Sequence, residues 1–191
     1  MGKVTWKGSA LLSPVPPALV TCGTMENPNV LTVAWTGIVC THPAMTYISV
    51  RPTRHSYAMI AQTGEFVINL PTSAMAKTVD FCGMKSGKKV DKIQKCHLTL
   101  AEGETVAVPI LADCPVNLEC KVTDTKVLGS HTMFLAEITA VRIEERFIDS
   151  KGKLNLQQAG LLAYAHGEYF ALGRKCGDFG FSVRKHKRPR S

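Results

Sequence analysis

Apolar and polar positions alternate along the chain in short stretches that end at glycine, proline or asparagine, a pattern typical of β-strands. The predicted strands lie within residues 15–24, 30–39, 46–50, 65–70, 98–100, 106–110, 117–127 and 132–147. Helical spacing predicts one helix over residues 54–62, stopped by Gly64, and a second that Ser73 caps and that runs to Gly83. Because many strands are accompanied by only two short helices, we predict a mainly β protein, an antiparallel barrel without helical crossovers.

Two segments depart from simple alternation. Residues 132–147 mix Met, Phe, Leu, Ile and Val with little alternation. This predicts a strand covered on both faces, by the core on one side and by a partner subunit on the other. Residues 84–95 are polar and rich in lysine, and we predict a loop there.

Composition places the chain among ordinary globular proteins, with 45% hydrophobic and 20% charged residues. No run approaches the roughly 18 consecutive apolar residues of a membrane span. The apolar stretch 10–22 resembles a signal peptide, but Pro14, Pro16 and Pro17 interrupt it. The seven cysteines are scattered and no CxxC pair occurs, which favours reduced thiols, no metal site and a cytoplasmic protein.

The net charge of +8 is concentrated at the C-terminal end. The basic residues there are Arg184, Lys185, Lys187, Arg188 and Arg190. Such a tail can bind RNA or DNA, but no aromatic platform accompanies it, so we expect a solvated terminus and no nucleic-acid partner. We therefore expect one domain over residues 1–183 and a flexible basic tail over 184–191.

The usual enzyme motifs are missing, including GxGxxG, GxSxG and HExxH, and residues 83–89 resemble a phosphate loop only faintly. One segment suits an anion. Arg51, Arg54, His55 and Ser56 follow a predicted strand and open a predicted helix, whose free N–H groups favour negative charge. Taken alone, the segment is equally explained as a turn and a helix cap.

A second polar segment precedes it. Asn29, Thr32 and Thr36 supply polar groups along a predicted strand, and Trp35 supplies an aromatic surface. A flavin ring needs polar partners along its edge and apolar cover on its faces. Trp35 alone is explained more simply as a core residue.

The segments NVLTVAWTGIV, YISVRPTRHSY, GEFVINLP, GKKVDKIQ, LECKV and AYAHGEYFALGRKCGDFGFSVRK occur in this order along the chain. Their order and spacing resemble the flavoredoxins, within the flavin-reductase-like FMN-binding split barrels. The resemblance implies a six-stranded antiparallel split barrel, a homodimer, and one noncovalent FMN per subunit near the dimer interface.

The resemblance also implies site residues. The residues that it places along the flavin pocket are Asn29, Thr32, Val33, Ala34, Trp35 and Thr36. It places the phosphate at Arg51, Arg54, His55 and Ser56. Asn69 would approach the edge of the ring, Lys92 would reach FMN, and His131 would contact the flavin or steer a nicotinamide. Tyr164 stands where relatives often carry Phe. The simpler explanations are a solvated loop charge for Lys92 and an ordinary residue at the start of a strand for His131.

The favoured function is an FMN electron-transfer protein resembling flavoredoxin, linked through the resemblance to sulfite or thiosulfate reduction and serving redox partner proteins. It requires no catalytic acid or nucleophile. The alternative is an NAD(P)H:FMN oxidoreductase. A more distant alternative, a nucleic-acid-binding β-barrel, depends on the basic tail alone.

Overall fold

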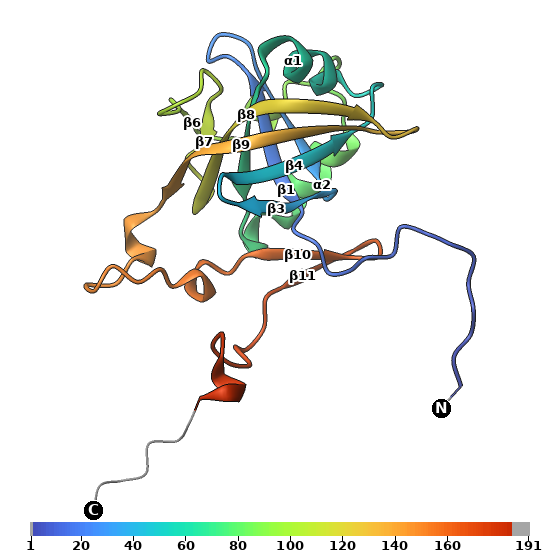
Figure 1. The fold of residues 1–191 in the computed structure, drawn as a ribbon. Coiled ribbons are helices and arrows are strands. Elements are labelled where there is room, and N and C mark those ends of the chain that lie inside the picture. Colours follow the sequence, from blue (N-terminus) through green and yellow to red (C-terminus); the bar gives the residue numbers. More distant parts are fainter. Residues whose placement is uncertain (1, 185–191) are drawn as a thin grey trace, which may run out of the picture.

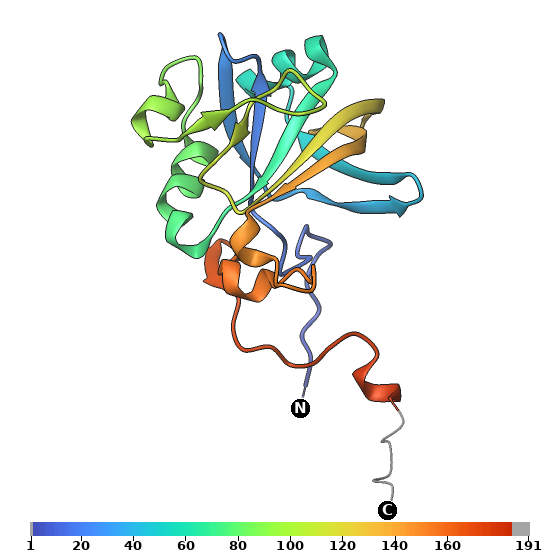
Figure 2. The ribbon, with the colours of Figure 1, turned by 90° about the vertical axis from the view of Figure 1, so that its left-hand side faces the viewer.

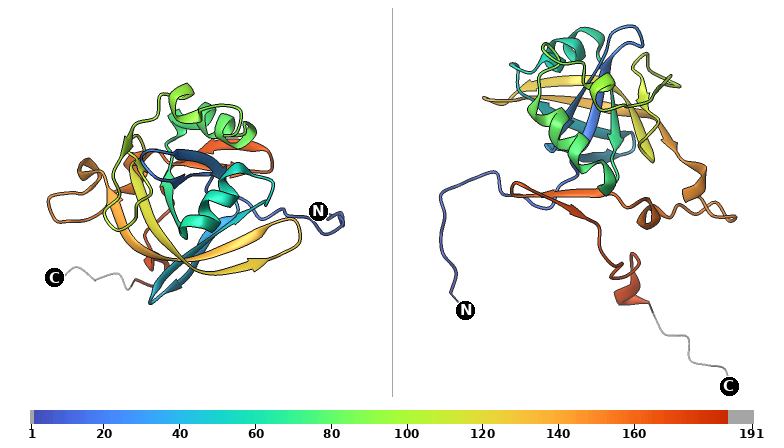
Figure 3. Two further views of the ribbon diagram at one scale, coloured as in Figure 1. Left: turned by 90° about the horizontal axis from the view of Figure 1, so that it is seen from above. Right: turned by 180° about the vertical axis from the view of Figure 1, so that it is seen from behind.

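The computed structural model describes residues 2–184, and its main sheet curls into a barrel that is open along one side (Figures 1 and 3). The order of the antiparallel strands is β2-β1-β5-β8-β9-β4-β3. Their bounds are Ala18–Gly23 (β1), Pro28–Val33 (β2), Thr36–Thr41 (β3), Ala44–Val50 (β4), Glu65–Leu70 (β5), Val116–Val127 (β8) and Thr132–Ile143 (β9). The predicted mainly β split barrel is confirmed, with seven strands in the sheet rather than six.

The extra strand arises where one long strand over residues 30–39 was predicted. The chain instead leaves β2 at Val33 and enters β3 at Thr36, and these two strands form opposite edges of the sheet. Ala34 and Trp35 carry the chain across the split, where the Trp35 carbonyl accepts a hydrogen bond of 2.9 Å from the N–H of Ser49 in β4. The sequence did not predict this break, because residues with high β-propensity continue through it. Propensity does not indicate which edge of the sheet a strand joins.

Alternating side chains of the strands fill the barrel interior. Phe66 and Ile68 of β5, Ile48 of β4 and Phe134 of β9 lie in this core. The intervening Val67 faces outward into a separate buried cluster beneath the loop that follows β6. Strand β5 is therefore buried on both faces, which explains why its sequence is nearly continuous in apolar residues.

The helices lie outside the sheet. Helix α1 (His55–Thr63) ends as predicted at Gly64, whose left-handed conformation (φ 67°) lets its N–H bond the carbonyl of Ile60. Helix α2 (Ala76–Met84) begins after a 3₁₀ turn (η1, Ser73–Met75), and no side chain caps it, so the predicted Ser73 cap is wrong. Helix α3 (Lys92–Lys95) lies inside the predicted loop, capped by Asp91. It is too short for a helical period to be visible in the sequence.

Two small antiparallel pairs complete the fold (Figure 2). Strands β6 (Leu100–Ala101) and β7 (Ile110–Leu111) pair at the side of the barrel, and β10 (Leu162–Ala165) pairs with β11 (Glu168–Ala171) below it. Short 3₁₀ turns lie at η2 (Glu145–Phe147), η3 (Leu156–Ala159) and η4 (Phe181–Val183). The hairpin of β10 and β11 contributes Tyr164 and Tyr169 to the apolar cavity described below.

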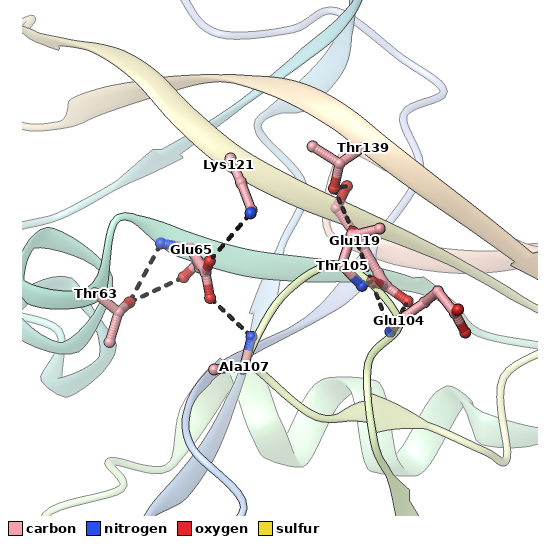
Figure 4. A network of polar contacts seen from close by, with 8 residues as sticks. All are labelled: Thr63, Glu65, Glu104, Thr105, Ala107, Glu119, Lys121 and Thr139. Carbon is pink, nitrogen blue, oxygen red and sulfur yellow. Dashed lines mark hydrogen bonds and ion pairs between the residues drawn. The ribbon is translucent and has the colours of Figure 1, made fainter.

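Two carboxylates fix the loop between β6 and β7 to the sheet (Figure 4). Glu119, fully buried in β8, accepts hydrogen bonds from the N–H groups of Glu104 and Thr105. Glu65 accepts one of 2.9 Å from the N–H of Ala107. Burial alone raises the pKa of Glu119, but these hydrogen bonds outweigh it and hold that pKa below its ordinary value. This network is structural and lies apart from the site described below.

Strand β9 is covered on one face by the barrel core, where Phe134 and Ala136 are buried. Its other face is only half-buried near Met133, and Val141 is exposed. Cover on that second face by a partner subunit stays a prediction. Of the predicted basic tail, all residues except Arg184 lie outside the described part of the chain. Within residues 2–184, no helix has the length and apolar character that crossing a membrane requires.

Candidate functional site

Two cavities meet at the split in the barrel, and Leu31, Arg51 and Arg54 line both of them. The first, the apolar cavity, has a volume of about 260 Å³, and the second, the cationic cavity, about 220 Å³. The other residues of the apolar cavity are Pro17, Thr32, Val33, Ala34, Trp35, Ser49, Val50, Asp80, Gly83, Met84, His131, Tyr164 and Tyr169. Those of the cationic cavity are Thr53, His55, Ser56, Cys82, Lys85, Ser86, Gly87 and Lys92.

The first turn of α1 forms one wall of the cationic cavity. Arg54 precedes the helix in an extended conformation and gives no side-chain cap, so the first N–H groups of α1 have no side-chain acceptor. Its guanidinium instead donates to the carbonyl of Gly83 at 2.9 Å. The buried Ser56 hydroxyl accepts a hydrogen bond of 2.6 Å from the Asn29 amide. This wall therefore presents free N–H groups, a hydroxyl and a guanidinium, a set of donors suited to an anion.

Lys92 carries a positive charge into the floor of the same cavity. Only 3% of its surface is exposed, and its ammonium donates to the carbonyl of Cys82 at 3.2 Å. Burial lowers the pKa of Lys92, and the nearby Arg54 charge lowers it further. Among the ion pairs of residues 2–184, none involves Lys92, Arg51, Arg54 or Lys85. A buried ammonium without a carboxylate partner is costly, so this floor favours a bound anion.

The segment Lys85, Ser86 and Gly87 closes the cationic cavity opposite α1. Gly87 lies so close to the wall that a Cβ atom there would stand 2.4 Å from Oδ1 of Asn29 and 3.0 Å from Cδ2 of His55. Sequence reasoning did not assign this segment to the site. The overlooked signal was the faint likeness of residues 83–89 to a phosphate loop. That likeness was dismissed because the glycine and lysine spacing does not match the nucleoside-triphosphate motif.

Aromatic side chains from distant parts of the chain flank the apolar cavity. Trp35 comes from the β2–β3 connection, and Tyr164 and Tyr169 come from the β10–β11 hairpin, with ring centroids 5.4 Å apart. The Tyr169 hydroxyl donates to Asp80 of α2 at 3.4 Å. Burial, followed by the charge of Asp80, raises the pKa of Tyr169 to about 12. The tyrosine is thus neutral at pH 7 and holds the hairpin against α2.

His131 lies immediately before β9, on the edge of the apolar cavity. Burial lowers the pKa of its imidazole, and the charges of Arg51 and Arg54 lower it further. The ring is therefore neutral at pH 7, able to donate from one nitrogen and accept at the other.

The chain matches the family described as flavin reductase like domain over residues 11–173. A protein of Archaeoglobus fulgidus is 35% identical over 144 residues, which is 75% of this chain and 81% of the relative. The chain belongs to the flavin reductase like family.

Solved structures share the architecture of this chain. Flavoredoxin of Desulfovibrio vulgaris (Miyazaki F) superimposes with a TM-score of 0.87 at 28% identity, covering 95% of this chain and 99% of that one. Flavoredoxin from Methanosarcina acetivorans gives a TM-score of 0.87 at 27% identity, covering 95% and 97%. An FMN-binding protein from Thermus thermophilus, at 24% identity and a TM-score of 0.78, shows the fold alone. The protein is a flavoredoxin-like member of the flavin reductase like family, and this membership supports a flavin-binding redox protein.

Most of the site residues that were predicted from the sequence lie together in the structure. The members that line the two cavities are Thr32, Val33, Ala34, Trp35, Arg51, Arg54, His55, Ser56, Lys92, His131 and Tyr164. Asn29 lies behind the cationic cavity, bonded to Ser56, and Thr36 donates to the carbonyl of Tyr47 at 2.6 Å.

Asn69 lines neither cavity. It is fully buried and donates to the carbonyl of Leu19 at 2.8 Å, while its Oδ1 accepts from the N–H of Leu111 and the amide of Asn117. These partners occupy its amide, so Asn69 joins β1, β5 and the segment around β7 as a structural residue. A buried asparagine in a strand gives no sequence signal that separates such a network from a ligand contact.

Proposed function

We propose that this protein binds one FMN noncovalently across the two cavities and acts as a flavin-dependent electron-transfer protein. The observation that carries the proposal is the junction of an aromatic-flanked cavity with a cationic one, joined at Leu31, Arg51 and Arg54. A flavin mononucleotide has the same division, a planar ring system at one end and a phosphate at the other. Family membership and the likeness to flavoredoxins support the same ligand.

The groups present fit FMN. For the phosphate, the cationic cavity offers Arg51, Lys85, Lys92, the Ser56 hydroxyl and the first N–H groups of α1. The absence of a side chain at Gly87 leaves room for the closing segment to approach Asn29 and His55. For the ring system, Trp35 and Tyr164 offer apolar faces.

When bound, FMN supplies the redox chemistry by accepting and returning electrons. Trp35, 37% exposed in the single chain, and Tyr164 cover the apolar cavity and limit the access of water. Arg51 and Arg54 stand at the junction of the cavities, where their charges favour the anion. Burial first, and then these two charges, lower the pKa of His131. His131 then holds a single ring proton that it can donate to a polar atom at the edge of the ring.

We include a homodimer in the proposal. Exposed apolar residues gather beside the site: Trp35, and Ile38 and Val39 of β3, which are 64% and 50% exposed. Figure 2 shows the β3–β4 hairpin projecting from the barrel. The N-terminal segment adds the exposed Leu12, which lies near Trp35 beside a third cavity. Burial of this patch by a second copy would complete the cover over the site. Light scattering after size-exclusion chromatography tests it, and a purely monomeric holoprotein would refute it.

The visible spectrum of the purified protein tests the flavin proposal. We expect a yellow protein with a flavin absorption spectrum, and release of FMN rather than riboflavin or FAD on denaturation. A protein that stays colourless after incubation with FMN, yet shifts RNA on a gel at low salt, would overturn the proposal in favour of a nucleic-acid function.

A second measurement separates the electron carrier from an NAD(P)H:FMN oxidoreductase. We expect the holoprotein to be reduced by a low-potential protein or chemical donor and to show no turnover with NADH or NADPH plus excess FMN. Sustained nicotinamide oxidation would identify a flavin reductase instead. A role in sulfite or thiosulfate reduction derives from the resemblance to flavoredoxins alone, and reduction of these acceptors by cell extract with and without the protein tests it.

A further inference from the structure

A groove along the outer face of α2 borders the apolar cavity. Its volume is about 520 Å³, and Asp80, Met84 and Tyr169 line both the groove and the apolar cavity. In α2, the groove residues Lys77, Asp80, Phe81 and Met84 follow the i, i+3, i+4, i+7 spacing of one helical face. The buried residues of the helix lie on its other face. A molecule seated in this groove would therefore lie beside the ring system of a flavin in the apolar cavity.

The groove offers apolar contact area that is open to solvent. The Met84 side chain is 73% exposed, and Ala76 and Phe81 are half-buried. Asp80 is the one acidic side chain among the described residues that line the groove, and its carboxylate accepts a hydrogen bond of 3.4 Å from the Tyr169 hydroxyl. This hydrogen bond holds the carboxylate against the β10–β11 hairpin, and the apolar side chains stay accessible beside it.

Lysines flank this apolar surface. Lys77 lies near the start of α2 and Lys85 directly follows its last residue, and both are exposed and line the groove. Among the ion pairs of residues 2–184, none involves either lysine. Further exposed lysines follow along the chain at Lys88 and Lys89. Apolar contact area with unpaired cations around it suits a partner whose own surface is acidic.

The positive charge of residues 1–183 is concentrated in the same part of the molecule. Residues 77–95 contain six lysines and two acidic residues, and Arg51 and Arg54 add two more cations. The remainder of residues 1–183 contains ten basic and thirteen acidic residues, so its net charge is negative. An acidic molecule that approaches the barrel is therefore directed toward α2 and the cationic cavity.

We propose that the outer face of α2 is the docking surface for an acidic electron-transfer protein that delivers electrons to the flavin past Met84 and Tyr169. The inference rests on the proposed binding of FMN and goes beyond it by assigning the surface and the charge of the partner. Each encounter oxidises a one-electron centre of the partner. Two encounters supply the two electrons, and water supplies the two protons, that reduce the flavin completely. Because the groove borders the ring cavity, its position suits a redox protein, whereas a nucleic acid would gain nothing from that position.

Stopped-flow reduction of the FMN-loaded protein by a reduced, acidic plant-type ferredoxin tests the proposal, since its [2Fe–2S] cluster is a low-potential one-electron donor. We expect the second-order rate constant of the wild type to fall with ionic strength. Lys77→Glu should lower this rate constant by about tenfold at low salt, and the loss should shrink at high salt because salt screens the charge. Lys77→Arg, which keeps the charge, should react like the wild type.

Lys151→Glu is the matched control for the reversal of charge. Lys151 is exposed in the loop between η2 and η3, which lies apart from α2 (Figures 1 and 3), and it lines none of the cavities beside the site. This substitution should change the rate constant by less than about twofold. Light-driven reduction by 5-deazariboflavin, an uncharged small donor, should proceed at the same rate in all variants, because it requires no docking.

Equal rate constants for the wild type, Lys77→Glu and Lys151→Glu would overturn the docking surface and leave FMN binding intact. The same holds for a wild type that deazariboflavin reduces but ferredoxin does not. If Lys77→Glu abolished an RNA shift at low salt without slowing ferredoxin, the patch would belong to a nucleic acid instead. A wild type that retains no FMN would overturn the proposed function itself. Lysine and glutamate have similar helix propensities, so Lys77→Glu should fold normally, and circular dichroism verifies this.

Discussion

The two halves of the site are built in different ways. The cationic cavity takes most of its groups from two short stretches of sequence, residues 51–56 and 82–92, and depends on charge and free N–H groups. The apolar cavity takes one or a few residues from each of several elements, including β2, β4, α2 and the β10–β11 hairpin, and one from the residue before β9, and it depends on shape. A phosphate gains affinity from a few strong contacts, whereas a ring system gains it from many weak ones.

This difference predicts that substitutions in the two cavities change flavin affinity in different ways. Loss of one buried cation should remove much of the affinity for FMN and leave riboflavin unaffected. Loss of one aromatic wall should weaken both flavins to a similar and smaller extent. The substitutions below test that contrast.

The largest effect is expected for Lys92→Met, which keeps the length of the side chain and removes its charge. FMN affinity should fall by about 100-fold, equivalent to roughly 3 kcal/mol for a buried charged contact, with riboflavin affinity unchanged. Binding is measured by the change in flavin fluorescence on addition of apoprotein. Lys95→Met is the control, since Lys95 is exposed on the same helix and lines neither cavity of the site. Equal losses for FMN and riboflavin would place Lys92 beside the ring rather than the phosphate.

The same substitution should have the opposite effect on the protein without ligand. The pKa of Lys92 in the folded apoprotein lies below its ordinary value of 10.5, mainly through burial. At pH values below the folded pKa, the unfolded chain holds this proton more favourably, so the charged lysine destabilises the apoprotein. Lys92→Met should therefore raise the free energy of unfolding of the apoprotein at pH 7. This advantage should shrink as the pH rises toward 10.5, as measured by urea denaturation across that range. A destabilised apo variant at pH 7 would show that the ammonium is satisfied without an anion.

The contrast also explains what could be predicted from the sequence. Arg51, Arg54 and Ser56 lie within six residues of one another. The pattern of a strand followed by a helix start therefore indicated an anion site from the local sequence, with a turn and a helix cap as an equally good explanation. Tyr169 and Asp80 contact each other across 89 positions, and nothing in the local sequence joins them. The break at Ala34 and Trp35 was missed for the same reason, because it depends on which edge of the sheet the next strand joins.

A smaller effect, shared by both ligands, is expected for Trp35→Ala. The loss of an aromatic wall should weaken FMN and riboflavin by about tenfold each, because aromatic contacts contribute about 0.5–1.5 kcal/mol beyond the area that they bury. Trp6→Ala is the matched control, since the sequence has two tryptophans and Trp6 is 66% exposed and lines neither cavity. Flavin binding should also quench the fluorescence of the Trp6→Ala protein, which retains Trp35. A loss confined to FMN would contradict the division of the site.

The smallest expected effect is an electrostatic coupling between the two cavities, measured as a change in the pKa of His131. The charges of Arg51 and Arg54 help to lower the pKa of its imidazole, after burial as the larger cause. A dianionic phosphate in the cationic cavity offsets those charges, so the pKa of His131 should be higher in the FMN complex than in the riboflavin complex. Because FMN and riboflavin carry the same ring system, both complexes should bury the imidazole to the same extent, and the difference in pKa therefore isolates the effect of the phosphate. Titration of the His131 ring resonances by NMR below and above pH 6.5, assigned with His131→Gln, measures it. The sign follows from charge alone: an anion near the guanidinium groups makes protonation of the imidazole easier. Identical pKa values in the two complexes would mean that the cavities, although they share Arg51 and Arg54, act on their ligands independently.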